Sequence, residues 1–155
     1  APDRKWTYGA KSFGGDISVP FCRMVGFEGE VWTGAALGGT YRGGIAQDVN
    51  TDMSKRQRIR SRGYFGQIGV KLTDRLTLWT GYGRDNPING HLKVKNRSMN
   101  ESGFLNLRFN VTKTGWIGIE YQRINTWYFE DHPGGGTRHR MYDDNRVQMT
   151  FCVKF

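Results

Sequence analysis

The last ten residues of the chain read Arg146-Val-Gln-Met-Thr-Phe-Cys-Val-Lys-Phe155, and they alternate strictly between apolar and polar side chains. The polar positions are Gln148, Thr150, Cys152 and Lys154. The apolar positions are Val147, Met149, Phe151, Val153 and Phe155. Successive side chains of a β-strand point to opposite faces, so a period of two predicts a strand with one apolar face.

Six further runs with the same alternation precede this segment, at residues 12–21, 27–37, 61–72, 75–83, 98–111 and 116–129. Short connections at about 22–26, 73–74 and 112–115 alternate with long, polar and glycine-rich ones at about 38–60, 84–97 and 130–145. Asp143-Asp144-Asn145 is predicted to form the turn before the last strand. Strict alternation of short turns and long loops is typical of outer-membrane barrels, whose short turns face the periplasm. The expected fold class is therefore all-β, an antiparallel transmembrane β-barrel with about seven strands in this chain.

Composition agrees with strands rather than helices. The chain has 155 residues, of which 22 are glycine and 14% are aromatic, and its length suits one domain. No segment approaches the about 20 apolar residues that a spanning helix needs, whereas a membrane strand needs an apolar residue only at alternate positions. The formal charge of +9 fits nucleic acid, lipopolysaccharide phosphates or anionic solutes, and charge alone does not choose among them.

The C-terminal segment resembles the terminal strand of outer-membrane barrel proteins. In that class an alternating strand ending in Phe is read by the assembly machinery, which implies an assembly signal at Met149, Phe151, Val153 and Phe155. Further stretches look like porin-type barrels, in which they occupy the final strands of a larger barrel: Gly38-Gly-Thr-Tyr-Arg-Gly-Gly-Ile-Ala-Gln-Asp-Val-Asn50, Ser61-Arg-Gly-Tyr-Phe-Gly-Gln67, Gly81-Tyr-Gly-Arg-Asp-Asn-Pro87 and Asn96-Arg-Ser98. That family is functionally mixed, so the resemblance implies no particular substrate.

The strand number raises a question about completeness. Bacterial single-chain barrels normally have an even number of strands with both ends in the periplasm. Seven strands ending at the periplasm would begin at the outer face. We therefore expect residues 1–155 to be a single β-barrel domain that is the C-terminal part of a longer barrel. An intact source protein with a mass near 17.7 kDa would contradict this expectation.

Polar side chains on the second face of the strands are candidates for a channel lining. They are Lys71, Arg108, Glu120, Gln122, Gln148 and Lys154, with Asn106 and Asn110 beside them. A wet, mixed-charge interior is typical of a channel, and excess Lys and Arg there would favour anions. The alternative is a set of charge pairs, such as Arg108 with Glu120, that holds the wall together.

Two loop regions are candidates for contact with small molecules or lipids. The segment 38–50 could fold into the lumen as a constriction that presents Tyr41, Arg42, Gln47 and Asp48, or it could be a free outer loop. Arginines on the parity of the outward-facing Ile68 would suit lipopolysaccharide phosphates near the outer rim. These are Arg56, Arg58, Arg60 and Arg62. The alternative for this run is a solvated loop, and nucleic acid is not the expected partner.

The remaining aromatic, histidine and cysteine residues point to no catalytic chemistry. Aromatic residues expected to form an interfacial girdle are Trp127, Tyr128, Phe129 and Tyr142, whereas Trp32, Trp79 and Phe104 face inward without an assigned role. The three histidines, His91, His132 and His139, fall in predicted outer loops. No catalytic residue, metal site or cofactor is predicted. Cys22 and Cys152 could be a disulfide or free thiols.

The expected function is a porin-like channel of the bacterial outer membrane for passive diffusion of small hydrophilic solutes, with anion preference left open. One alternative is a closed structural or lipopolysaccharide-binding barrel, and another is a soluble lipocalin-type barrel that binds a ligand. Expected partners are outer-membrane lipid and lipopolysaccharide, small solutes and the barrel-assembly machinery, with no nucleic acid. A homo-oligomer is left open.

Overall fold

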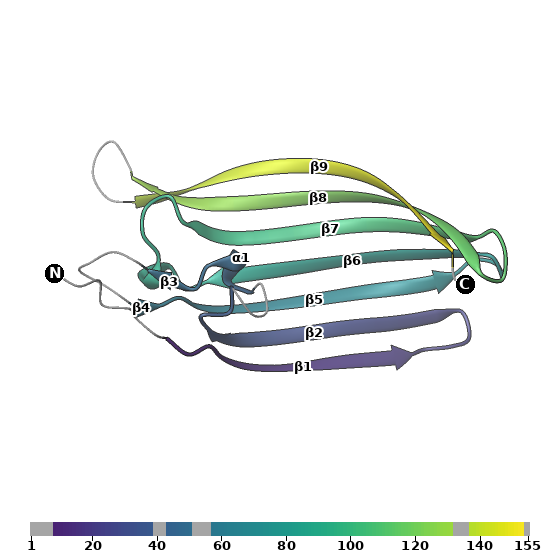
Figure 1. The fold of residues 1–155 in the computed structure, drawn as a ribbon, viewed down its shortest axis with the longest axis horizontal. Coiled ribbons are helices and arrows are strands. Elements are labelled where there is room, and N and C mark those ends of the chain that lie inside the picture. Colours follow the sequence, from purple (N-terminus) through teal and green to yellow (C-terminus); the bar gives the residue numbers. More distant parts are fainter. Residues whose placement is uncertain (1–7, 39–42, 51–56, 132–136, 154–155) are drawn as a thin grey trace.

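A computed structural model describes residues 8–38, 43–50, 57–131 and 137–153. One antiparallel sheet dominates it, with the order β1-β2-β5-β6-β7-β8-β9 (Figure 1). Its strands are β1 Lys11–Pro20, β2 Val25–Ala35, β5 Arg60–Lys71, β6 Leu76–Pro87, β7 Arg97–Asn110, β8 Gly115–Asp131 and β9 Thr137–Val153. The smaller elements are α1 Gly43–Ala46, β3 Val49–Asn50, β4 Gln57–Arg58 and η1 Asn89–His91. Within the described part of the chain, no helix has the length and apolar character needed to cross a membrane.

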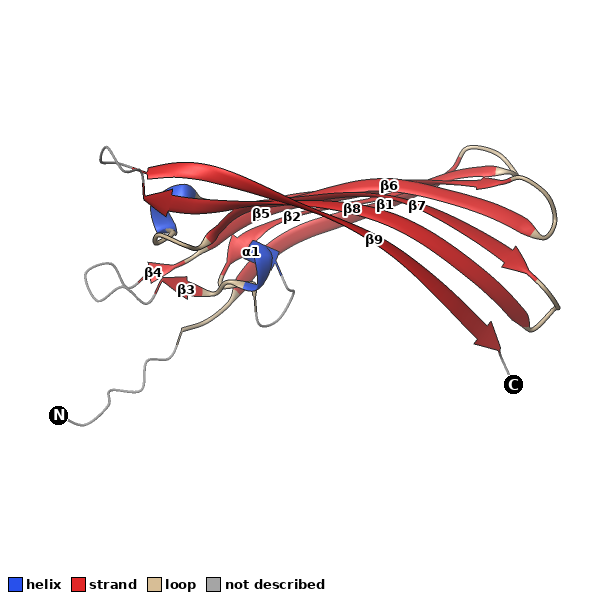
Figure 2. Cartoon of the chain, turned by 90° about the horizontal axis from the view of Figure 1, so that it is seen from above, coloured by secondary structure: helices blue, strands red, loops and turns tan. Residues whose placement is uncertain are grey.

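The predicted all-β antiparallel sheet of seven strands is confirmed. Each strand of the large sheet pairs with its neighbours along that order, so β1 and β9 form the two edges (Figure 1). Among the described residues these edges have no second partner, and the sheet is open rather than closed into a barrel. It curves strongly, and α1 and the β3–β4 hairpin lie on the side toward which it bends (Figure 2).

Three tight turns share one hydrogen-bond pattern at one end of the sheet. In each turn two successive backbone N–H groups donate to one carbonyl, which belongs to Val25 (3.0 and 3.1 Å), Leu76 (2.9 and 3.1 Å) or Gly115 (2.9 and 3.1 Å). Thr73 Oγ1 accepts from the N–H groups of Arg75 and Leu76 within its turn at 3.2 and 3.0 Å. The long connections lie at the opposite end of the sheet (Figure 1). The predicted alternation is therefore confirmed for the long connections after β2 and after β6, whereas β8 ends at Asp131 and β9 begins at Thr137, a separation close to that of the tight turns.

The predicted outer loops at 84–97 and 130–145 are too long. β6 continues to Pro87, β8 runs to Asp131 and β9 starts at Thr137, so the predicted turn at Asp143-Asp144-Asn145 and the predicted loop position of His139 lie inside β9. The pairing persists through Trp127 with Met141 and Tyr128 with Arg140. Polar and aromatic side chains occupy both faces there, so the apolar alternation that indicates a strand is absent although the hydrogen-bond ladder continues.

The register gives the large sheet two chemically different faces. The apolar face carries Ile17, Val31, Ile68, Leu78, Leu105, Leu107, Phe109, Ile117, Ile119, Val147, Met149, Phe151 and Val153. The polar face carries Asp16, Glu28, Glu30, Gln67, Asn106, Arg108, Glu120, Gln122 and Gln148. Many side chains of the apolar face are openly accessible, with Val147 70% and Phe151 69% exposed. Among the residues that the structure describes, the buried hydrophobic side chains are instead Ala36, Leu37, Ile45, Ile59 and Leu92, which belong to the long connections.

Aromatic rings lie flat against glycines on the polar face, and this packing gives Trp32, Trp79 and Phe104 a role that the sequence did not suggest. A Cβ atom added at Gly69 would lie 2.5 Å from the Trp79 ring, and one at Gly81 would lie 2.5 Å from the Phe104 ring. The Trp32 ring occupies the same position over Gly63. Because glycine has no side chain, a ring from the neighbouring strand can cover its backbone, which suits a strongly curved sheet.

Candidate functional site on the polar face

The loop before β3 folds back over the polar face and is held there by hydrogen bonds. Ile45 N–H in α1 donates to Asp85 Oδ2 at 2.9 Å, and Asp85 lies on the polar face of β6 opposite Gly63. The side-chain amide of Gln47 joins the backbone of Arg97, with Nε2 donating to the carbonyl at 2.8 Å and Oε1 accepting from the N–H at 3.1 Å. Figure 2 shows α1 beneath the curved sheet. These hydrogen bonds hold the described part of this loop on the polar face of the sheet.

Unusual backbone geometry makes the docked loop compact. Ile45 and Ala46 have φ values of 54° and 57°, in the left-handed region that costs about 1–2 kcal/mol per residue for side chains other than glycine. Gly38 passes close beneath them, since a Cβ there would lie 2.5 Å from the Ala46 carbonyl carbon and 2.6 Å from Gln47 N. Leu37 is 1% exposed, so apolar burial helps to hold this conformation.

Two of the four predicted constriction residues, Gln47 and Asp48, lie in the described part of the chain, and both make hydrogen bonds there. Gln47 is engaged with Arg97, and Asp48 accepts a hydrogen bond from Ile59 N–H through its backbone carbonyl at 2.8 Å. Tyr41 and Arg42 lie outside the described residues. Gln47 therefore positions the loop, because its side-chain amide bonds to the backbone of Arg97 in β7, 50 residues farther along the chain.

Most predicted lining residues lie together on the polar face of β7, β8 and β9. Asn106 Nδ2 donates to Glu120 Oε2 at 3.1 Å. Arg108 Nε donates to Asn110 Oδ1 at 3.3 Å, and its guanidinium carbon lies 4.6 Å from the centre of the Trp116 ring. The side chains of Arg108 and Glu120 thus contact other groups rather than one another.

The other predicted lining residues have varied surroundings. Gln122 is the register partner of Arg146, and Gln148 is the partner of Glu120, so both lie within the same polar surface. Lys71 lies at the turn end of β5, where Nζ is 3.1 Å from Asp74 Oδ1. Lys154 lies outside the described residues.

An acidic group on β1 and β2 completes the polar face and was not singled out from the sequence. Asp16 and Glu30 are direct register partners, and Glu28 Oε2 accepts from Gln67 Nε2 at 2.6 Å. Arg108 and Arg146 lie across the sheet, on β7 and β9. The charged side chains that β1 and β2 direct to the polar face are thus all acidic, whereas β7, β8 and β9 carry both signs there, with Glu120 and Asp144 beside the two arginines. The alternation of each strand shows which way these side chains point, but only the register between strands groups them.

The predicted lipid-contact arginines are split between two elements. Arg60 and Arg62 are exposed at the start of β5 and share the parity of Ile68. Arg58 belongs to the small β3–β4 sheet, where a guanidinium nitrogen donates to the Gly9 carbonyl at 3.1 Å, so the strand parity does not extend to it. Arg56 lies outside the described residues.

Three tyrosines mark the limit of the apolar face toward the long connections. They are Tyr64, Tyr82 and Tyr121, and on the same face the next positions are Arg62, Arg84 and Arg123. Tyr82 Oη donates to Glu101 Oε2 at 2.5 Å, and Tyr121 Oη donates to Asn145 Oδ1 at 2.6 Å. An apolar ring with a polar tip suits the boundary between hydrocarbon and water.

The aromatic residues predicted as a girdle lie farther out. Tyr128 and Tyr142 are on the polar side of β8 and β9, where their rings meet edge to face with centres 5.5 Å apart. Trp127 pairs with Met141 on the other side, and the Phe129 ring contacts His139 at 5.4 Å. Trp127, Tyr128 and Phe129 thus lie in a strand as predicted, whereas Tyr142, which was predicted to lie in a loop, belongs to β9, and the girdle itself stays a prediction.

The predicted assembly-signal side chains are exposed on edge strand β9. Met149 is 56%, Phe151 69% and Val153 62% exposed, and Phe155 lies outside the described residues. Cys22 and Cys152 are free thiols, one at the β1–β2 turn and the other on β9 at the opposite edge. In the described ranges no group of three or more His, Cys, Asp or Glu side chains is placed to hold a metal ion.

Comparison of the chain with protein-family models, with curated proteins and with solved structures found no match in any of the three. The similarity to porin-type barrels therefore stays a prediction.

Proposed function

We propose that this sheet is part of the wall of a porin-like β-barrel in the bacterial outer membrane, through which small hydrophilic solutes diffuse. The observation that carries the proposal is the division of one sheet into an exposed apolar face and a polar face on which a loop is anchored. In water, so large an exposed apolar surface would be unfavourable. In a bilayer it would contact lipid, while the polar face would line a wet interior.

The dimensions of the apolar face support this placement. It extends from Tyr64 on β5 to Leu72, the residue that follows this strand, which is about 27 Å at about 3.4 Å per residue. A tilt of about 40° reduces this to about 21 Å, close to the about 25 Å apolar band of outer-membrane barrels. The edges of β1 and β9 would need further strands as partners, since unpaired backbone groups are not tolerated in hydrocarbon.

The loop that carries α1 is the proposed constriction. It projects from the long-connection end onto the polar face, where it would narrow a lumen and bring solutes near the charged groups of that face. The acidic residues of β1 and β2 face a mixed set on β7 to β9, in which Glu120 accompanies Arg108 and Arg146, so the balance between these groups sets any anion preference. A reversal potential measured across a salt gradient would give the sign of that preference.

Conductance in planar lipid bilayers tests the channel directly. The full-length protein, folded in detergent and shown by circular dichroism to be rich in β-structure, is expected to insert with discrete, ohmic steps. A tight electrical seal from well-folded, inserted protein would refute the channel. Insertion is checked independently by resistance of the strands to added protease.

A closed barrel is the second candidate, because the same loop and the flat-lying Trp32, Trp79 and Phe104 rings occupy part of the polar face. It predicts a seal for the intact protein and conductance only after the loop is shortened. A soluble barrel is a weaker alternative, since it would leave Val147, Met149 and Phe151 exposed to water. It would remain monodisperse without detergent.

A further inference from the structure

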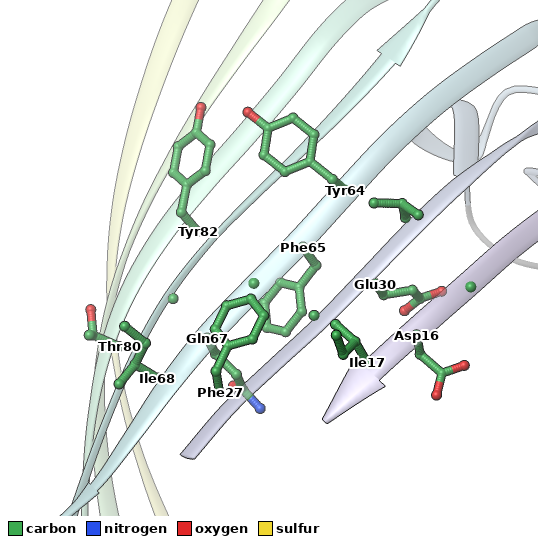
Figure 3. A pocket seen from close by; sticks show the side chains of 15 residues that line it. Asp16, Ile17, Phe27, Glu30, Tyr64, Phe65, Gln67, Ile68, Thr80 and Tyr82 are labelled. Atoms are coloured by element: carbon green, nitrogen blue, oxygen red, sulfur yellow. The ribbon is translucent and has the colours of Figure 1, made fainter. Parts of the chain in front are cut away.

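The apolar face is hollowed between β1 and β6. The hollow has a volume of about 790 Å³, and its apolar-face lining includes Ile17, Phe27, Val31, Tyr64, Ile68 and Tyr82 (Figure 3). Gly29 and Gly66 are register partners in its floor, and neither contributes a side chain.

Aromatic rings bound the hollow on two sides. The Phe27 ring lies against the glycine floor, 3.0 Å from where a Cβ of Gly29 would be and 3.3 Å from where a Cβ of Gly66 would be. Tyr64 and Tyr82 stand toward the long connections with their ring centres 6.1 Å apart, and Figure 3 shows the two rings side by side. The hollow is thus a bounded apolar groove rather than a flat part of the face.

Basic side chains lie along the rim of the hollow that faces the long connections. Arg84 is the register partner of Tyr64, and Arg62 lies two residues beyond Tyr64 on the same side of β5, about 7 Å along the strand. Arg60 and Lys11 occupy the next row, both paired with Ala35. Within the described part of the chain, these four cations form no salt bridge.

The acidic side chain beside this rim is already engaged. Glu101 is the register partner of Arg84, and its carboxylate accepts from Tyr82 Oη at 2.5 Å and from Asn125 Nδ2 at 3.2 Å. Arg123 on β8 provides the contrast, because it lies on the same face but is paired with Asp143 at 3.8 Å. The four cations of the rim outnumber the Glu101 carboxylate beside them, so the rim carries net positive charge.

We propose that the hollow and its basic rim bind one anionic lipid of the surrounding membrane, with an acyl chain against the apolar lining of the hollow and a phosphate against Arg60, Arg62 and Arg84. Planar guanidinium groups form paired, charge-assisted hydrogen bonds with phosphate, and a carbon chain gains van der Waals contact with the apolar side chains of the groove. The site rests on the proposed function only in requiring that the apolar face lie in lipid. The basic rim of this site includes Arg84 and Lys11, which lie outside the arginine run at residues 56–62 and were not predicted to contact lipid.

Lipid binding to the full-length protein in detergent micelles tests this site by native mass spectrometry. Dioleoyl phosphatidic acid is the phosphorylated probe, dioleoyl phosphatidylcholine has the same chains with a zwitterionic headgroup, and inorganic phosphate is the headgroup alone. We expect phosphatidic acid to bind at least about tenfold more tightly than phosphatidylcholine, because it can form several additional charge-assisted contacts with the basic rim. Inorganic phosphate at equal concentration is expected not to displace it.

Three variants separate the parts of the site. R62Q/R84Q should abolish the preference for phosphatidic acid, whereas the matched control R123Q should leave it intact. Gly66→Val adds a branched side chain to the floor of the hollow, and it should weaken the binding of both lipids while leaving the ratio of their affinities unchanged. An unchanged preference in R62Q/R84Q, an equal loss in R123Q, or full displacement by inorganic phosphate would each overturn the proposal.

The result is independent of the channel. A barrel that seals a bilayer but prefers phosphatidic acid would remove the proposed conductance and leave the lipid site. A barrel that conducts but does not prefer phosphatidic acid would support the channel and remove the lipid site.

Discussion

Ile45 N–H and Asp85 Oδ2 are 2.9 Å apart, and this hydrogen bond ties the loop that precedes β3 to the polar face of β6. The two residues are 40 positions apart in the chain. This contact holds the loop on the polar face, so a substitution that removes the hydrogen bond should release the loop.

We expect Asp85→Ala to loosen the docked loop. A hydrogen bond to a charged group contributes about 1.5–3 kcal/mol, so its loss should markedly raise the population of undocked loop. In planar bilayers the variant should show a larger or noisier single-channel conductance than the parent protein. Asp144→Ala, which removes a carboxylate from β9, is the matched control, and equal effects of the two changes would show that the Asp85 contact does not hold the constriction.

We expect Ala46→Gly to strengthen the same docking. The φ of 57° costs Ala46 about 1–2 kcal/mol, and glycine removes that cost while adding about 0.5–1 kcal/mol of backbone entropy loss. Hydrogen exchange of the Ile45 amide should therefore slow by about two- to fivefold. Gly38→Ala should have the opposite effect, because its Cβ would meet the Ala46 carbonyl carbon at 2.5 Å. Faster exchange in Ala46→Gly would contradict the assigned geometry.

Gly69 and Trp79 should behave as one unit. Gly69→Ala places a Cβ 2.5 Å from the Trp79 ring and should destabilise the sheet by about 1–3 kcal/mol in urea titrations. In a Trp79→Ala background the same glycine change should cost much less, because the ring it displaces is gone. Gly15→Ala is the control, since nothing lies within 4 Å of its added Cβ. Strict additivity of the two changes would mean that the ring does not rest on Gly69.

The two faces of β9 should respond differently to charge. Phe151→Lys introduces an ammonium group on the apolar face and should cost about 2–4 kcal/mol if that position lies near the middle of the bilayer, and less near an interface. Gln148→Lys lies on the polar face of the same strand and should change stability by about 0.5 kcal/mol or less. Reversible urea unfolding in lipid vesicles measures both. Similar costs at the two positions would place neither face in lipid.

Much of the strand pattern could be predicted because it is local. A strand directs alternate side chains to opposite faces, so the alternation of Val147, Met149 and Phe151 with Gln148 and Thr150 indicates both the strand and its apolar side. Short polar turns are also local, and those at Thr73 and Thr112 were predictable for that reason. The same reasoning failed for the first part of β9, which was predicted to be a loop, because Tyr142 and its neighbours lie on a surface without apolar alternation.

Most of the strands, and the apolar side of each, follow from the order of the residues along the chain, because backbone geometry ties these properties to neighbouring residues. Which residues of different strands and loops face one another follows from the folded arrangement alone. The pairing of Asp16 with Glu30, the Trp79 ring over Gly69 and the docking of Ile45 on Asp85 all join residues that are distant in the chain. Such contacts depend on register and loop path, which alternation along one strand does not specify.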